Sequence, residues 1–334
     1  MVYNAHAKLP PLRSDPNPAM PPRAPMTLFA GTAHRDLAES VAQHLGVPLG
    51  DLKITRFPDT EIYIKFEESV RGTDAFILQP TCAPIDQNLL ELLILIDALR
   101  RASARSITCV LPYYGYARQE KKDRPREPIT AKLIANLITT AGADRIVAMD
   151  LHADAIQGFF DIPVDHLTSV NVIADYFVEK KLENVAVVSP DEGRVKKLRR
   201  FANKLNAPLA VGYKFHPEHG VSAVSGLAGD VRGKTCIIYD DIISTGGSIN
   251  AIVDTLLEHG ALPEIYVACT HAVLAGPAMQ RLSRPEIAEL IVTDTIPVSE
   301  DKRIGKLKVI SVAYLFAEAL RRVWTGDSVS SLFD

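Results

Sequence analysis

The sequence alternates short apolar segments typical of β-strands with segments typical of helices, and this alternation constrains the fold more than any other feature. The strand-like segments are Thr27–Ala30, Ile62–Phe66, Ala75–Gln79, Ile107–Leu111, Ile146–Asp150, Val185–Ser189, Thr235–Asp240, Ile265–Thr270 and Leu290–Thr293. The helix-like segments lie near residues 34–45, 87–103, 129–141, 169–180, 192–205, 246–259 and 313–323. This order predicts an α/β protein in which mainly parallel sheets are flanked by helices on both faces.

The chain of 334 residues is too long for one ordinary core, so we expect two domains. A boundary near residues 166–170 fits the change from Asp165-His166-Leu167 into the next helix-like segment. Residues 1–25 contain seven prolines and lack the apolar core of a signal peptide. We interpret them as a disordered extension, or as the product of a start codon upstream of Met26.

The bulk composition excludes several classes of function. A net charge of −3 gives no general electrostatic attraction for nucleic acid. The longest apolar run, Leu89–Ile96, is interrupted by Glu91 and is too short to span a bilayer, so no membrane role is expected. Four widely separated cysteines indicate buried, reduced thiols in a cytoplasmic protein, and they are Cys82, Cys109, Cys236 and Cys269.

Polar side chains follow three of the predicted strands, at the point where each strand ends. They belong to Asp150-Leu151-His152, to Ser189-Pro190-Asp191 and to the pair Asp240-Asp241. Phosphate and nucleotide sites of parallel sheets gather at the carboxyl ends of the strands. The sequence therefore predicts a ligand site at these strand ends.

The run from Asp240 to Ser248 is the strongest single motif. Two acids, Asp240 and Asp241, end an apolar strand, and a loop of small residues leads into a helix; the loop residues are Ser244, Thr245, Gly246, Gly247 and Ser248. Backbone N–H groups, hydroxyls and the helix dipole can cradle a phosphate there. The acids would then bind sugar hydroxyls or a divalent cation. Alternatively, the acids only cap the helix and the glycines only turn the chain.

Seven motifs together resemble the ribose-phosphate pyrophosphokinase (phosphoribosyl pyrophosphate synthetase) family. They are Arg56–Glu61, Pro112–Gln119, Arg126–Lys132, Asp150–Ala153, Gln157–Asp161, Ser189–Asp191 and Asp240–Ser248. The resemblance runs from Met26 to Ser328–Phe333 and implies two phosphoribosyltransferase-like domains. Residues 26–167 would form the ATP side and residues 168–334 the ribose 5-phosphate side. The implied reaction transfers the diphosphoryl group of ATP to the C1 hydroxyl of ribose 5-phosphate and releases AMP.

The resemblance also implies roles for individual residues. The implied ATP-binding residues are Phe57, Asp59, Thr60, Glu61, Arg118 and Gln119, with Phe57 stacking on adenine across a subunit boundary. His152 and Asp191 correspond to positions associated with Mg²⁺, although His152 could instead be a histidine that bonds only to backbone. The ribose 5-phosphate would be held by Asp240, Asp241 and the loop Ser244–Ser248.

Three positions depart from the family pattern. The family's catalytic loop carries Lys-x-Arg, whereas this chain has Lys214 and His216 after a short strand at Ala207–Ala210. A histidine supplies neither the permanent charge nor the planar donor fork of arginine. Ser244 stands where many members have Asp. Arg194 stands where many have Gly, and we expect it to face solvent.

Two other functions remain open at this point. The His216 replacement would suit a catalytically weak, nucleotide-binding regulatory subunit that assembles with an active paralogue. The Asp240–Ser248 loop alone would also suit a phosphoribosyltransferase that consumes the diphosphate. The resemblance further implies a cytoplasmic homo-hexamer with phosphate and ADP as effectors.

Overall fold

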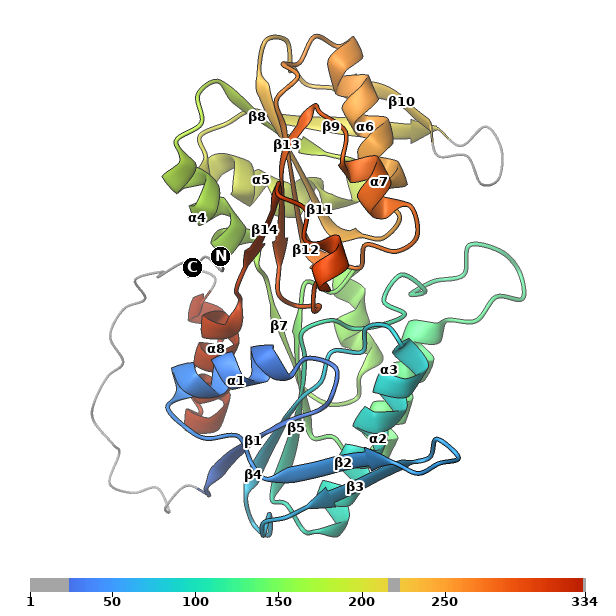
Figure 1. Cartoon of the computed structure of the whole chain (residues 1–334), viewed down its shortest axis with the longest axis vertical. Helices are drawn as coiled ribbons and strands as arrows, with labels where there is room; N and C mark the ends of the chain where they lie inside the picture. The colour runs from blue at the N-terminus through green and yellow to red at the C-terminus, as the bar shows by residue number, and fades with distance from the viewer. Residues whose placement is uncertain (1–23, 216–222, 333–334) are drawn as a thin grey trace. The chain divides into compact units, whose positions relative to one another are not determined.

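The computed structural model describes residues 24–215 and 223–332, and Figure 1 shows its helices and strands. The predicted Pro-rich extension and His216 therefore lie outside the described residues, apart from Ala24 and Pro25. The contacts divide the chain into two units. The first unit contains residues 24–167 and 313–332, and the second unit contains residues 168–312.

The first unit is built on a parallel sheet with the strand order β1-β4-β5-β6-β7. Its strands are β1 (Met26–Ala30), β4 (Asp74–Leu78), β5 (Ser106–Leu111), β6 (Arg145–Met149) and β7 (Val164–Leu167). A separate antiparallel hairpin is formed by β2 (Leu52–Arg56) and β3 (Ile62–Phe66). The helices are α1 (Arg35–Leu45), α2 (Ile85–Arg101), α3 (Thr130–Ala141), the 3₁₀ segment η1 (Asp154–Phe159) and α8 (Ala313–Thr325). Buried side chains of α2 and α3 share one core with the sheet.

The last helix, α8, belongs to the first unit although the sequence placed it in the second domain. It packs against α1, and Arg321 donates through Nη2 to the carbonyl oxygen of His44 at 3.0 Å. The indole N–H of Trp324 donates to the carbonyl oxygen of Ala24 at 3.0 Å. The 3₁₀ segment η4 (Ser330–Leu332) follows. The chain thus leaves the first unit after Leu167 and returns to it at Ala313.

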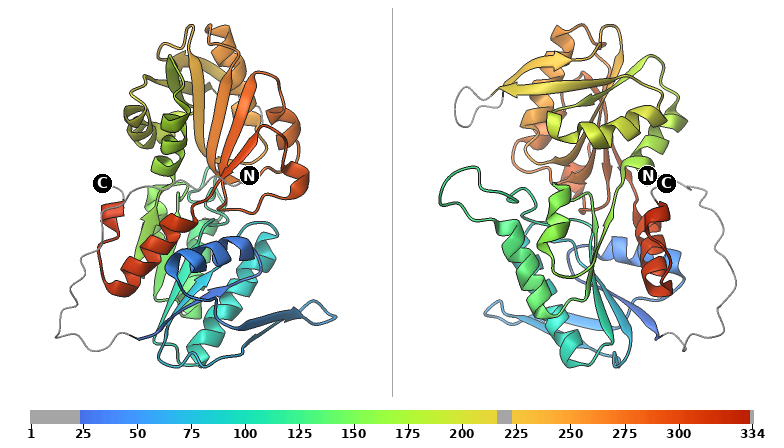
Figure 2. Two further views of the ribbon diagram at one scale, coloured as in Figure 1. Left: turned by 60° about the vertical axis from the view of Figure 1, so that its left-hand side comes forward. Right: turned by 180° about the vertical axis from the view of Figure 1, so that it is seen from behind.

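The second unit contains a sheet with the order β10-β9-β8-β11-β12-β13-β14, parallel except for β10. Its strands are β8 (Val185–Ser189), β9 (Leu209–Phe215), β10 (Ala223–Ala228), β11 (Thr235–Ile243), β12 (Ile265–Ala272), β13 (Ile287–Thr293) and β14 (Leu307–Ile310). Its helices are α4 (Val170–Lys180), α5 (Val195–Lys204), α6 (Gly247–Glu258) and α7 (Ala278–Leu282), with 3₁₀ segments η2 (Glu192–Arg194) and η3 (Glu300–Lys302). Figure 2 shows these elements from two further sides.

The two faces of the second sheet carry separate hydrophobic cores. Cys236 and Ile238 of β11 join the core formed with α6 and α7. Ile237 and Tyr239, the intervening residues, join the core formed with α4 and α5. This division follows from the alternation of side chains along a strand. The predicted α/β class, with parallel sheets flanked by helices, is confirmed.

Two further expectations can be compared with the described residues. All four cysteines are free and buried, as the composition indicated. In the part of the chain that the structure describes, no helix has both the length and the apolar character needed to cross a membrane.

Candidate functional site

The predicted phosphate loop lies at the carboxyl end of β11 in the second unit. The sequence predicted that this strand ends at Asp240, and that prediction is wrong. The strand continues through Asp240 and Asp241 to Ile243 and stays paired with β12. All nine residues of the strand are buried. Both acids therefore lie within the paired part of β11, where backbone hydrogen bonds to β12 fix the positions of their carboxyl groups.

The start of α6 provides backbone N–H donors that no side chain caps. Gly246 precedes the helix with φ of 72°, a left-handed conformation that favours glycine, and it gives the helix no side-chain cap. The first N–H groups of a helix have no partner within the helix. The hydroxyl-bearing residues Ser244, Thr245 and Ser248 surround this helix start in sequence, with Thr245 exposed. This arrangement suits a phosphate group.

Arg281 contacts this loop, and the sequence did not predict that contact. It comes from the short helix α7, and its Nη1 donates to the carbonyl oxygen of Thr245 at 3.0 Å. The backbone N–H of Ala275 donates to the carbonyl oxygen of Ser244 at 2.8 Å, which ties the same loop to the segment after β12. The sequence around Arg281 carries no motif, so only the fold reveals this contact.

We expected Arg194 to face solvent, and that prediction is wrong. Arg194 forms ion pairs with both acids. Its Nε lies 2.8 Å from Oδ1 of Asp240, and its Nη1 lies 2.6 Å from Oδ1 of Asp241. The side chain of Arg194 is only 12% exposed. The contact arises because β8 and β11 are parallel neighbours, so the turn after β8 lies beside the end of β11.

Burial and charge act in opposite directions on the two acids. Burial raises the pKa of Asp240 to about 8, although the positive charge of Arg194 opposes that rise. For Arg194, burial lowers the pKa, but the charges of Asp240 and Asp241 outweigh it and raise the pKa overall. The arginine therefore stays charged, and its charge favours the ionised form of Asp240 against the effect of burial.

Asp191 lies on the same turn as Arg194. Its carboxylate accepts the backbone N–H of Gly193 at 3.1 Å, and the hydroxyl of Ser189 donates to its carbonyl oxygen at 2.5 Å. The charge of Asp191 also acts on both Arg194 and Asp240. The structure thus brings Asp191, Arg194, Asp240 and Asp241 into one charged group at the carboxyl ends of two strands.

Within the described ranges, no group of three or more His, Cys, Asp or Glu side chains could hold a metal ion by itself. Mg²⁺ differs from most metals in this respect, because proteins commonly hold it by one or two carboxylates while substrate phosphates and water fill the other positions. The carboxylate of Asp191 on an accessible turn fits that kind of binding. The residues present are therefore compatible with Mg²⁺ that arrives with a nucleotide.

Lys214 lies on β9, next to the end of the described segment. Its backbone pairs with Val224 of the antiparallel strand β10, and a bulge follows between Val224 and Gly226. His216, the other predicted catalytic residue, falls outside the described residues. The predicted role of the Lys214–His216 pair remains a prediction.

In the first unit, His152 lies in the loop after β6. The backbone N–H of Leu151 donates to Nε2 of His166 at 2.9 Å, and Asp150 adopts a positive φ of 39°. Nδ1 of His166 lies 3.2 Å from Nε2 of Gln157 and 3.8 Å from Oδ1 of Asp154. His166, which sequence reasoning missed, therefore supports the half-buried His152 loop through a neighbouring strand.

The predicted nucleotide residues Phe57 to Glu61 form the tight turn of the β2–β3 hairpin. The backbone N–H of Phe57 donates to the carbonyl oxygen of Glu61 at 2.9 Å, and the N–H of Glu61 donates to Oδ1 of Asp59 at 3.2 Å. Thr60 has a positive φ of 77°. The ring of Phe57 is 49% exposed and touches Tyr63 edge to face. An aromatic ring held out on a rigid turn is available for stacking on a planar ligand.

Arg118 and Gln119 lie in a different loop, after β5. Both side chains are exposed. The hydroxyl of Thr130 donates to Oε1 of Gln119 at 2.6 Å, and the N–H of Ala131 donates to its carbonyl oxygen at 3.2 Å. Gln119 therefore positions the start of α3. The first unit carries its predicted site residues on three separate loops: the hairpin, the segment after β5 and the segment after β6.

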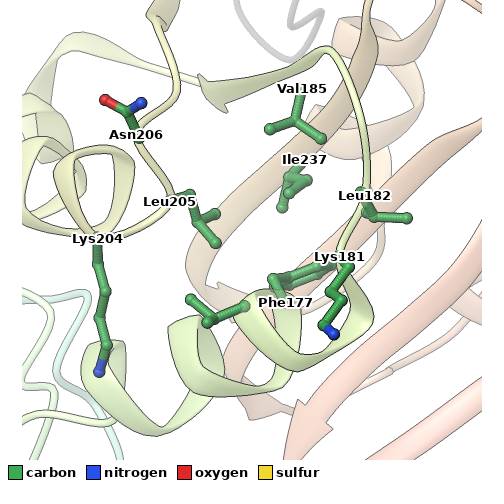
Figure 3. A pocket seen from close by; sticks show the side chains of 9 residues that line it. Phe177, Lys181, Leu182, Val185, Lys204, Leu205, Asn206 and Ile237 are labelled. Atoms are coloured by element: carbon green, nitrogen blue, oxygen red, sulfur yellow. The ribbon is translucent and has the colours of Figure 1, made fainter.

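A cavity in the second unit lies away from these loops. Figure 3 shows its lining, in which apolar side chains such as Phe177 and Leu205 lie beside the polar side chains of Lys181, Lys204 and Asn206. Val185 and Ile237, which also line it, come from the amino-terminal ends of β8 and β11. The cavity is thus at the opposite end of the strands from Asp191 and Asp240, and it is not part of the predicted site.

Comparisons with known proteins match nearly the whole described chain. The sequence model for the N-terminal domain of ribose phosphate pyrophosphokinase matches residues 26–142, and the model for the phosphoribosyl synthetase-associated domain matches residues 217–334. The ribose-phosphate pyrophosphokinase of Caldanaerobacter subterraneus subsp. tengcongensis is 53% identical over 309 residues, covering 92% of this chain and 98% of that protein. That of Clostridium tetani is 51% identical over 315 residues, covering 93% and 98%.

A solved structure agrees with these relatives. The crystal structure of phosphoribosylpyrophosphate synthetase from Mycobacterium smegmatis superposes with a TM-score of 0.85 at 48% sequence identity. The match covers 90% of this chain and 99% of that one. At this level of identity and coverage, the similarity extends over both units and is not a likeness of fold alone.

Proposed function

The chain belongs to the ribose-phosphate pyrophosphokinase family, and from this we propose how its residues carry out the reaction of such an enzyme. In that reaction the C1 hydroxyl oxygen of ribose 5-phosphate attacks the β-phosphorus of ATP. The bond between the β-phosphorus and the oxygen bridging it to the α-phosphorus breaks, and AMP leaves with that oxygen. The proton of the hydroxyl is lost to solvent, and the product is 5-phosphoribosyl 1-diphosphate, a precursor for nucleotide synthesis.

The single observation that carries the proposal for the sugar site is the end of β11. It places two buried carboxylates directly before a hydroxyl-rich loop and an uncapped helix start. We assign the 5-phosphate to the loop Ser244–Ser248 and the ribose hydroxyls to Asp240 and Asp241. Phosphate oxygens accept from the helix N–H groups and hydroxyls, while sugar hydroxyls donate to the carboxylates. Arg281 holds the loop in place through Thr245.

We assign the nucleotide to the loops of the first unit. The exposed ring of Phe57 supports stacking on adenine, and the adjacent turn carries Asp59, Thr60 and Glu61. The exposed Arg118 supplies positive charge for the phosphates, with Gln119 next to it. The functional domains would then be residues 26–167 for ATP and residues 168–334 for ribose 5-phosphate, although α8 packs with the first unit.

Mg²⁺ is the cofactor that this chemistry requires, because the transferred diphosphoryl group carries a high negative charge that a divalent cation neutralises. We propose that Asp191 and His152 take part in holding it, directly or through water. Phosphate oxygens of ATP would complete the site. Lys214, and His216 where relatives carry arginine, would cover the diphosphoryl group from the β9 side and stabilise its charge.

The proposed activity is tested by measuring AMP formation with ATP and Mg²⁺, with and without ribose 5-phosphate. We expect AMP to form only when the sugar phosphate is present. The Lys214→Ala variant should lose roughly 10²- to 10³-fold in kcat, because it removes one charge that stabilises the transition state. Arg199→Ala, which removes an exposed cation of the same unit, is the control and should keep wild-type kcat. An unchanged rate in Lys214→Ala would show that the loop is wrongly assigned.

One observation favours a second function. The family's arginine is replaced by His216, which suits a weakly active, nucleotide-binding subunit that assembles with an active paralogue. Retention of Lys214, Asp191 and the Asp240–Ser248 loop supports the enzyme instead. A phosphoribosyltransferase activity would need turnover of phosphoribosyl pyrophosphate with a nucleobase and without ATP.

We further propose a cytoplasmic homo-hexamer in which phosphate and ADP act as effectors, as the family resemblance implies. Sedimentation and AMP assays with added ADP or phosphate test these features separately.

A further inference from the structure

One guanidinium group bridges the two acids assigned to the sugar hydroxyls. Arg194 engages Oδ1 of Asp240 through Nε and Oδ1 of Asp241 through Nη1. The backbone N–H of Asp241 donates to the same Oδ1 of Asp240 at 2.9 Å. Two of the four carboxylate oxygens are therefore engaged by a single side chain that comes from the neighbouring strand end.

The rigid shape of the guanidinium group of Arg194 constrains the distance between the carboxyl groups of Asp240 and Asp241. A guanidinium is planar and rigid, so the positions of its Nε and Nη1 atoms are fixed relative to each other. The two ion pairs thus set the distance between the carboxyl groups of Asp240 and Asp241, in addition to neutralising charge. A lysine at position 194 would supply a single point charge without this fixed spacing.

In this chain Arg194 supplies the positive charge that offsets the repulsion between the two acids. Asp240 and Asp241 are 8% and 3% exposed, and adjacent buried carboxylates repel each other. The ligand proposed for the next loop is itself an anion. Without Arg194, the acid pair would separate or take up a proton, and either change would remove acceptors for ligand hydroxyls.

We propose that Arg194 is a positioning residue that holds Asp240 and Asp241 at the spacing of two adjacent sugar hydroxyls, and that it thereby makes the site selective for phosphorylated sugars with a vicinal diol. This inference rests on the assignment of the ribose hydroxyls to the two acids. Arg194 does not touch the reacting atoms; it acts through the acids.

The test compares binding of ribose 5-phosphate and 2-deoxyribose 5-phosphate to the full-length protein by titration calorimetry. Arg194→Ala should weaken ribose 5-phosphate binding about 10- to 100-fold, the range expected when hydrogen bonds to charged groups are lost. Binding of the deoxy sugar, which lacks the diol, should change by no more than about threefold, so the preference for ribose 5-phosphate should collapse. Arg199→Ala, an exposed arginine on α5, should leave both affinities unchanged.

Two further measurements separate spacing from charge and from folding. Arg194→Lys should keep thermal stability but retain only part of the diol preference, and free guanidinium ion added at millimolar concentration should restore part of it in Arg194→Ala. If Arg194→Ala fails to fold, Arg194→Lys decides the question, and a wild-type preference in that variant would overturn the inference.

The remaining outcomes are also decisive. Equal weakening for both sugars would place Arg194 at the phosphate and would overturn the proposed role. If the wild type binds ribose 5-phosphate with the diol preference described but forms no AMP, the proposed enzymatic function fails while the role of Arg194 stands. If the wild type forms AMP and both sugars bind Arg194→Ala as they bind the wild type, the function stands and the role of Arg194 fails.

Discussion

His216 is the proposed catalytic residue that departs from the Lys-x-Arg pair implied by the family resemblance. An imidazole has an ordinary pKa near 6.5, so it carries little positive charge above neutral pH, whereas arginine remains charged throughout. We therefore expect His216→Arg to raise kcat by at least about tenfold at pH 8.

A pH series of kcat for wild type and His216→Arg checks this prediction. Lys214→Arg is the matched control, since it replaces one permanent charge of the same segment with another. A ratio of the two kcat values that stays near one at pH 8 would show that histidine is fully competent here, and it would remove the motive for a regulatory subunit.

The acid pair and its loop could be predicted from the sequence because their residue types are contiguous. Their supporting arginines could not. Arg194 approaches the site from the turn after β8 and Arg281 from helix α7, and no local pattern predicts these contacts. His166 was missed for the same reason, since it reaches the His152 loop from the next strand. Contacts that depend on which strands are neighbours require the topology.

At the scale of elements, the central strands were predictable and several short strands were not. All nine strands of the alternating pattern are present, and the short strand predicted at Ala207–Ala210 overlaps β9, which begins at Leu209 and continues to Phe215. The unpredicted β7, β10 and β14 are edge strands of their sheets, and β2 belongs to the isolated hairpin. Edge strands are short and partly exposed, so their sequences lack the continuous apolar run that marks a central strand. The short helix α7 was missed because five residues carry too little periodicity.

Asp294, the residue that follows β13, has a carboxyl group whose protonation is linked to the stability of the fold. Asp294 accepts the backbone N–H of Val312 at 2.8 Å, and burial raises its pKa from 3.8 to about 6. The folded state therefore holds this proton more tightly than the unfolded chain. The contribution of Asp294 to stability is thus largest below about pH 4, and it declines as the pH rises to 6.

Asp294→Asn removes this titration while keeping an oxygen that can accept from Val312. The difference in unfolding free energy between variant and wild type should rise by about 3 kcal/mol in favour of the variant between pH 4 and pH 7. Denaturant unfolding across this range measures it. Asp230→Asn, at an exposed position of the same unit, serves as the control. A difference that stays flat with pH would contradict the burial argument.

At the scale of the whole chain, the return of α8 to the first unit is the feature that the sequence did not reveal. The helical pattern near residues 313–323 was correct, but a helix pattern does not indicate which sheet it packs on. Inside α8, Glu318 and Arg322 form an ion pair of 2.8 Å, and both are buried at 4% and 6% exposure. Arg322 also donates to the carbonyl oxygen of Ser328 at 2.8 Å.

Removing Arg322 leaves the buried Glu318 with one of its two arginine partners, because Nη1 of Arg321 also lies 2.8 Å from Oε2 of Glu318. Arg322→Ala should therefore destabilise the protein by about 1.5–3 kcal/mol, the range for hydrogen bonds to charged groups. Arg303→Ala breaks a largely exposed pair with Glu300 and should cost less than about 1 kcal/mol. Trp324, the sole tryptophan of the sequence, reports unfolding of α8 by fluorescence. Equal losses in the two variants would show that α8 is not held by the buried pair.

Because the second unit is one continuous stretch inserted into the first, the order of synthesis on the ribosome matters. Residues 168–312 are complete as soon as they have left the exit tunnel, and they can fold while translation continues. The first unit cannot complete its fold at that stage, because α8, which packs against α1, follows residue 312 in the sequence. During that interval the nascent first unit exposes the apolar surface that α8 will cover, and it is then the part of the chain most in need of a chaperone.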